Sequence, residues 1–104
     1  MQNQRKHVRV PIRAQVICVV GTDTLRGVTS NISQSGIQVE IPELKTGANL
    51  QLTFRLPRSE SIIDVRGAVV WQKVRRHGIK FKYMGERSQQ SIRHFIAQRT
   101  AGGA

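Results

Sequence analysis

The chain has 104 residues, which suffices for one domain and is too short for two independent hydrophobic cores. Its 17 lysines and arginines outnumber 6 acidic residues, and the resulting net charge of +11 favours an anionic partner. Hydrophobic residues make up 38% of the sequence, which excludes a wholly disordered polycation.

The sequence also argues against membrane insertion, secretion and disulfide bonding. No apolar run approaches the roughly 18 residues that a membrane-spanning helix needs. The charged N-terminal segment lacks the apolar stretch of a secretory signal. The single cysteine, Cys18, excludes an internal disulfide and any site with several thiolate ligands. We therefore expect a cytoplasmic protein without a membrane span.

The N-terminal residues 1–11 are polar and basic, and we expect them to form an arm that precedes the folded domain. Beyond them, the alternation of apolar and polar side chains predicts six strands. These strands cover residues 12–20, 25–30, 37–41, 50–56, 62–74 and 79–83. Gly67, inside the fifth predicted strand, marks a bulge or a close approach of two strands.

The last segment changes to helical spacing from about Glu86. Ile92, Phe95 and Ile96 then lie on one face of a helix. Six strands followed by one helix predict an all-β fold, namely a six-stranded antiparallel barrel whose C-terminal α-helix covers one opening with this apolar stripe. Residues 12–99 would form the domain, and residues 100–104 a flexible tail.

The residue types that commonly carry catalysis are scattered along the chain. No pair of acids has the spacing of an acid–base couple, and His7, His77 and His94 form no metal-ligand spacing. Cys18 is in phase with the apolar face of the first strand, which favours a core position. We expect neither an enzyme nor a bound metal or cofactor.

Two short motifs carry more information. Arg5 and Arg9 are four residues apart in the basic arm, where two guanidinium groups can hold one bulky anion such as a phosphate. A solvated basic tail has the same composition. Asn31, Ser33 and Gly36 lie between two predicted strands and offer an amide, a hydroxyl and an open backbone. An ordinary turn uses the same residues.

In this order, Arg5-xxx-Arg9 and Asn31-x-Ser33-xx-Gly36 resemble the paired motifs RxxxR and (D/N)xSxxG of PilZ domains. The resemblance extends to residues 67–71 and 78–81. It implies a barrel that binds the bacterial second messenger cyclic di-GMP without catalysis. The two arginines would hold phosphates and a guanine. Asn31 and Ser33 would contact guanine edges and nearby phosphate, while Gly36 keeps the turn open.

Two positions depart from the family pattern, and the role of a third residue stays open. Asn31 stands where Asp is more frequent, and an amide has one acceptor oxygen where a carboxylate can accept both N1–H and N2–H of guanine. Gln4 precedes Arg5, so the additional arginine of some relatives is absent and the number of ligands per domain is open. Trp71 is in phase with Val69, so it would either pack in the core or stack on the ligand.

The charge leaves other functions open. A small basic barrel can bind single-stranded nucleic acid, although three Phe, one Tyr and one Trp offer few stacking platforms. A PilZ-like adaptor without a ligand is a further alternative. If cyclic di-GMP binds, residues 1–9 are expected to be mobile until the ligand orders them and presents a new surface to a protein partner. The basic residues between 66 and 82 would attract the ligand or an acidic partner.

Overall fold

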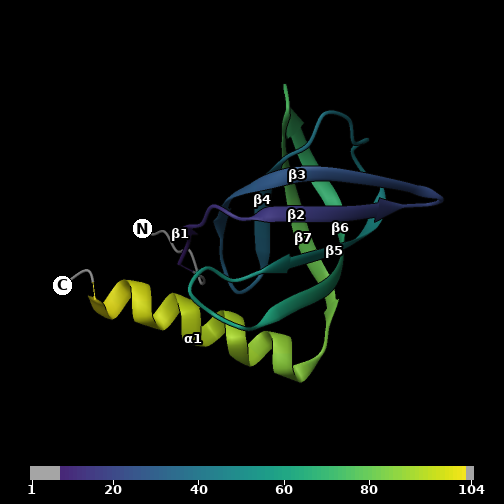
Figure 1. Cartoon of the computed structure of the whole chain (residues 1–104). Coiled ribbons are helices and arrows are strands. Elements are labelled where there is room, and N and C mark those ends of the chain that lie inside the picture. The colour runs from purple at the N-terminus through teal and green to yellow at the C-terminus, as the bar shows by residue number, and fades with distance from the viewer. Residues whose placement is uncertain (1–7, 103–104) are drawn as a thin grey trace.

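The computed structural model describes residues 8–102, which contain seven strands and one helix. Figure 1 shows the strands wrapped into a barrel, with the helix beneath one open end. The elements are β1 (Val10–Pro11), β2 (Gln15–Val20), β3 (Asp23–Ile32), β4 (Gly36–Glu40), β5 (Asn49–Arg55), β6 (Ile62–Lys73), β7 (Arg76–Met84) and α1 (Glu86–Gly102).

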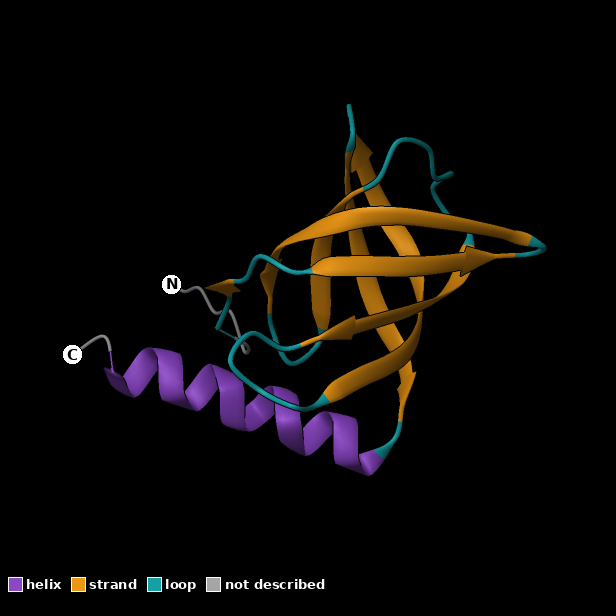
Figure 2. Ribbon diagram, viewed as in Figure 1, coloured by secondary structure: helices purple, strands orange, loops and turns teal. Residues whose placement is uncertain are grey.

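The barrel is closed by pairing between β3 and β4. Antiparallel neighbours follow the order β3–β2–β5–β6–β7–β4, and β4 pairs back onto β3. Six strands therefore form a ring in which each strand has a hydrogen-bonded neighbour on both sides (Figure 2). The prediction of a six-stranded antiparallel barrel with a C-terminal helix is confirmed. Closure also removes the long open edges that amphipathic strands would otherwise expose.

The short strand β1 lies within residues 1–11, which we expected to form an arm that precedes the folded domain. Val10 and Pro11 pair with Ile32 and Asn31 of β3, and Val10 is only 5% exposed. The folded part therefore begins at Val10 rather than at residue 12, because the Val10 side chain joins the apolar core of the barrel. Residues 1–7, which include Arg5, lie outside the described residues.

The first predicted strand is interrupted at its start. The structure begins β2 at Gln15 rather than at residue 12, because the buried side chain of Thr29 replaces part of the strand ladder. Thr29 Oγ1 accepts a hydrogen bond from the Ala14 N–H at 2.8 Å. The same oxygen lies 3.3 Å from the Ile12 carbonyl oxygen and 3.2 Å from that of Ala14. Thr29 thus ties the segment between β1 and β2 to β3.

The barrel interior and α1 share one core. Cys18 is fully buried, as predicted, and burial raises the pKa of its thiol to about 11. The predicted helical stripe is also confirmed, since its three apolar residues Ile92, Phe95 and Ile96 are buried against the barrel. The helix continues past the expected boundary at residue 99, because no Gly or Pro interrupts it before Gly102.

Gly67 is the point of close approach that the sequence predicts. The pairing of β6 with β7 shifts between Arg66 and Gly67. A Cβ atom at Gly67 would lie 2.5 Å from the carbonyl oxygen of Lys80, so only glycine fits without a shift of the backbone. The extra residue at this shift is Lys82 of β7, and the bulge increases the local bend of that strand and helps the sheet to close.

Candidate ligand-binding site

Four residues on adjacent strands form a row across the outer face of the barrel, which we call the outer row. Asn31 of β3 pairs with Gln38 of β4, Gln38 pairs with Gly78 of β7, and Gly78 pairs with Trp71 of β6. The apolar residues that flank Asn31 and Gln38 along their strands are buried in the core. Because side chains alternate between the two faces of a strand, the outer row faces away from the core.

Arg9 joins the outer row at Asn31. Arg9 Nη1 donates a hydrogen bond to Asn31 Oδ1 at 2.8 Å, and Asn31 Nδ2 donates to Gln38 Oε1. Strand β1 positions Arg9, since Pro11 pairs with Asn31. The structure therefore brings together one residue from each sequence motif. Arg5, the other arginine of the first motif, lies outside the described residues.

Ser33 lies in the turn between β3 and β4, with its hydroxyl directed at the backbone of that turn. Its side chain is buried, and Ser33 Oγ accepts hydrogen bonds from the N–H groups of Ser35 and Gly36, each at 3.2 Å. The Ser33 N–H donates to the Gly36 carbonyl oxygen at 2.8 Å. These bonds fix the turn and, with it, the register that sets Asn31 opposite Gln38.

Gly36 is required for close packing of two strands. A Cβ atom at Gly36 would lie 2.6 Å from the carbonyl oxygen of Ile79 in β7. Gly36 also pairs with Lys80, whose exposed side chain adds a positive charge near the outer row. The glycine therefore determines how closely β4 and β7 approach.

Trp71 lies at the end of the outer row and outside the core. Its side chain is 39% exposed. In β6, Val69 pairs with Ile79 and Trp71 pairs with Gly78, so Val70 is an extra residue on that strand. Because of this bulge, the alternation that holds up to Val69 no longer tells which side chains after it point inward. Of the two roles that the sequence leaves open for Trp71, core packing is excluded.

Gln38 and Gly78 belong to the outer row although neither sequence motif includes them. A Cβ atom at Gly78 would overlap the Trp71 indole, so the glycine makes room for the ring beside β7. A signal for Gln38 exists in the sequence, because a turn over residues 33–36 sets Asn31 opposite Gln38. The position of Gly78 beneath Trp71 depends on the bulge in β6, which alternation of side chains does not reveal.

The chemistry of the outer row consists of amide hydrogen bonds, positive charge and one aromatic face. Arg9 and Lys80 supply the charge. Within the described residues, no group of three or more His, Cys, Asp or Glu side chains could hold a metal ion. In the same part of the chain, α1 is neither long enough nor apolar enough to cross a membrane.

The family model of the PilZ domain matches residues 3–98. This chain belongs to the PilZ family. The match spans both sequence motifs and the whole outer row, and it confirms the resemblance that the motifs indicate. No curated protein matches this PilZ chain.

Solved structures of other PilZ proteins share the fold. The Bacillus subtilis inhibitor of motility, MotI/DgrA, has a TM-score of 0.81 and 21% identity, and the match covers 96% of this chain and 53% of that chain. YcgR from Escherichia coli, in complex with c-di-GMP, has a TM-score of 0.81 and 14% identity, with 96% and 47% covered. The PilZ domain of CeSA from a cellulose-synthesizing bacterium has a TM-score of 0.70 and 15% identity, with 88% and 98% covered. This PilZ chain thus spans about half the length of the first two proteins.

Proposed function

We propose that this PilZ chain is a cytoplasmic receptor that binds cyclic di-GMP across the outer row and catalyses no reaction. The observation that carries the proposal is the 2.8 Å hydrogen bond from Arg9 to Asn31. It unites two motifs that are distant in the sequence, in a row that ends at an exposed tryptophan. The complex of the related YcgR with c-di-GMP supports the choice of ligand.

The outer row and its arginine complement each part of cyclic di-GMP. The Arg9 guanidinium holds a phosphate or the O6/N7 edge of a guanine through paired N–H donors. The Asn31 amide offers an acceptor and donors to the hydrogen-bonding edge of guanine. The Trp71 ring presents a face on which a base stacks. In this proposal Arg5 supplies the second guanidinium, Ser33 orders the turn, and Gly36 lets β4 lie close to β7.

Ligand binding exchanges internal hydrogen bonds for bonds to the ligand. Arg9 and Gln38 engage both ends of the Asn31 amide, so the ligand takes over at least one of these contacts. Arg9 then turns onto a phosphate, and the arm that precedes Val10 closes over the ligand. Because Val10 is buried, β1 anchors this movement. The closed arm and the ligand together form the surface that a protein partner recognises.

Titration calorimetry with cyclic di-GMP tests the proposal. We expect a Kd of about 1 μM or below, which corresponds to roughly −8 kcal/mol or better. Arg9→Ala should weaken binding at least about tenfold, because a ligand phosphate loses its charged partner. Arg26→Ala removes the same charge from an exposed position on β3 and should leave the affinity unchanged. Near-wild-type affinity of Arg9→Ala would exclude the proposed site.

Binding of single-stranded nucleic acid has less support. Among the described residues, the exposed aromatic side chains are Trp71 and Tyr83, whereas Phe54 and Phe95 are buried. A single-stranded nucleic acid stacks successive bases on aromatic side chains, and two exposed side chains provide few such stacking positions. An oligonucleotide that binds more tightly than cyclic di-GMP in the same calorimeter would favour this alternative.

A further inference from the structure

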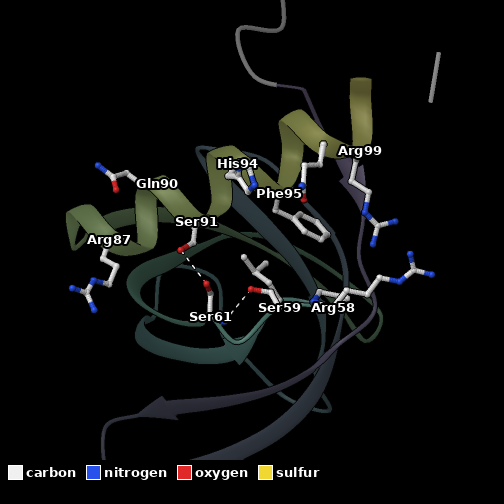
Figure 3. Close-up of a pocket in the computed structure, with 12 residues that line it drawn as sticks. Arg58, Ser59, Ser61, Arg87, Gln90, Ser91, His94, Phe95 and Arg99 are labelled. Atoms are coloured by element: carbon white, nitrogen blue, oxygen red, sulfur yellow. Dashed lines mark hydrogen bonds between the residues drawn. The ribbon is translucent and has the colours of Figure 1, made fainter. Parts of the chain in front are cut away.

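A groove of about 470 Å³ lies between α1 and the loop of residues 56–61 (Figure 3). It shares no residue with the outer row. Its apolar floor includes the buried side chains of Leu56 and Phe95. Ser59, Ser61 and Ser91 line it with hydroxyl groups, and Ser91 Oγ donates to Ser61 Oγ at 3.3 Å, which links the helix to the loop. The groove thus combines an apolar base with polar walls.

The walls of the groove are positively charged. Arg87 lies at one end, and Arg58 and Arg99 lie at the other (Figure 3). All three arginines are exposed, and none of the described residues that line the groove is acidic. Guanidinium groups form paired hydrogen bonds with carboxylates. The groove therefore favours a negatively charged occupant.

Two of these arginines are constrained in the free protein. The Arg99 guanidinium lies 4.8 Å from the centre of the Phe95 ring, a cation–π contact that limits its freedom. Arg58 follows Pro57 in a turn and has a φ of 59°, a backbone conformation that favours glycine.

We propose that this groove docks an acidic segment of a partner protein. Carboxylates of the segment pair with Arg58 and Arg87, its backbone bonds to the serine hydroxyls, and an apolar side chain contacts the floor. A nucleic acid fits less well, because no exposed Phe, Tyr or Trp lines the groove on which bases could stack. The inference rests on the proposed role of the chain as a receptor that signals to a protein partner.

The probe for this site is a fluorescein-labelled peptide in which glutamate alternates with leucine, and a glutamine–leucine peptide is its control. The variant Arg58→Gly/Arg87→Gln removes two cations from the groove, and glycine suits the positive φ at residue 58. The matched variant Lys73→Gln/Arg75→Gln removes the same charge where β6 ends and the chain turns into β7. This end of the β6–β7 hairpin points away from α1 (Figure 1). Fluorescence anisotropy is measured at about 0.15 M salt, where distant surface charges are screened.

We expect the groove variant to weaken binding of the glutamate peptide at least about tenfold and the matched variant less than about twofold. Equal losses in the two variants would overturn the proposal, because binding would then follow net charge alone. An oligonucleotide that binds more tightly than the peptide, and loses affinity only in the groove variant, would overturn it in favour of nucleic acid.

Calorimetry with cyclic di-GMP separates the failure of this inference from the failure of the proposed function. Wild-type affinity for cyclic di-GMP in the groove variant, together with the specific loss of the peptide, supports a docking site distinct from the ligand site. If the groove binds no peptide while cyclic di-GMP still binds wild type, the docking proposal fails and the receptor stands. If the peptide binds the groove but cyclic di-GMP does not bind, the docking site stands and the receptor function fails.

Discussion

At the scale of single residues, Gly78 determines where the Trp71 ring lies. A Cβ atom at Gly78 would overlap the indole, so Gly78→Ala should displace the ring from the outer row. We expect several-fold weaker binding of cyclic di-GMP, since loss of base stacking costs about 1–3 kcal/mol per base. Calorimetry measures the affinity. The emission of the only tryptophan in the chain reports the displacement of the ring.

Gly85→Ala is the matched control for this substitution. A Cβ atom at Gly85 would meet no heavy atom within 4 Å, so the same added methyl group has no neighbour to displace. The control should keep both the fluorescence and the affinity of the wild type. Unchanged affinity in Gly78→Ala, despite a shifted emission spectrum, would show that Trp71 does not contact the ligand.

Asn31 provides a second prediction at this scale, because its amide has one acceptor oxygen. Asn31→Asp should bind cyclic di-GMP as well as the wild type or better, since a carboxylate accepts both guanine donors with charge assistance. Asn31→Ala should lose the preference over cyclic di-AMP, because adenine presents an amino group and an unprotonated N1 to the site. Calorimetry with both dinucleotides measures this preference. Equal binding of the two by the wild type would contradict guanine recognition by Asn31.

At the scale of the elements, Thr29 links the β1–β2 segment to β3. Thr29→Val keeps the shape of the side chain but leaves the partly buried Ala14 N–H without its acceptor. We expect the free energy of unfolding to fall by about 1–3 kcal/mol. Urea denaturation measures this change, and hydrogen exchange of the Ala14 amide should become faster.

Thr53→Val serves as the comparison for Thr29. Thr53 Oγ1 donates to Asp64 at 3.3 Å on the exposed side of β5, where water can replace the lost bond. Its substitution should change the free energy of unfolding by less than about 0.5 kcal/mol. Equal destabilisation by the two variants would indicate that the Thr29 hydrogen bond has no special role in attaching the β1–β2 segment to β3.

The elements also show what the sequence could and could not predict. Alternation reports which side of a strand is buried, so it located the six barrel strands, and helical spacing located the stripe of α1. Alternation failed at β1, because a strand of two residues is shorter than any periodic pattern. It left the role of Trp71 open between the core and the ligand, because the extra residue at Val70, which changes the phase of β6, is not visible in the alternation. The contact of Arg9 with Asn31 depends on long-range pairing, and only the motif resemblance connected the two residues.

At the scale of the whole molecule, the buried thiol of Cys18 makes stability depend on alkaline pH. The ordinary pKa of this thiol is 9.0, whereas burial raises the pKa in the folded state to about 11. The unfolded chain therefore loses the proton first. The contribution of Cys18 to stability is intact below pH 9 and declines as the pH rises toward 11. The decline amounts to about 1.4 kcal/mol per pKa unit.

Urea unfolding at about pH 8 and about pH 10.5 tests this pH dependence. Cys18→Ala should lose less stability between the two pH values than the wild type. The other groups that ionise at alkaline pH are common to both proteins and cancel in the comparison. An identical loss in both would contradict the assignment to Cys18.

Strand β1 lies between the two proposed binding surfaces, the outer row and the groove beside α1. A shallow hollow lined by Pro11 and Arg99 lies between this strand and α1. Pro11 pairs with Asn31 of the outer row, and Arg99 forms one end of the groove. A displacement of β1 would therefore reach both surfaces.

The hydrogen bond between Arg9 and Asn31 bears on the concentration of cyclic di-GMP at which the proposed site is half-occupied. In the proposed mode of binding, Arg9 competes with the ligand for Asn31. Because β1 tethers Arg9 to this acceptor, its effective concentration is set by the chain, on the order of millimolar for a short flexible link. Because Arg9 belongs to the same chain as Asn31, its effective concentration does not change when the protein is diluted. The concentration of messenger needed for half-occupancy therefore depends on how firmly Val10 and Pro11 hold Arg9 in place. In the proposed receptor, substitutions in β1 shift the sensitivity to cyclic di-GMP while the groups proposed to recognise guanine stay the same.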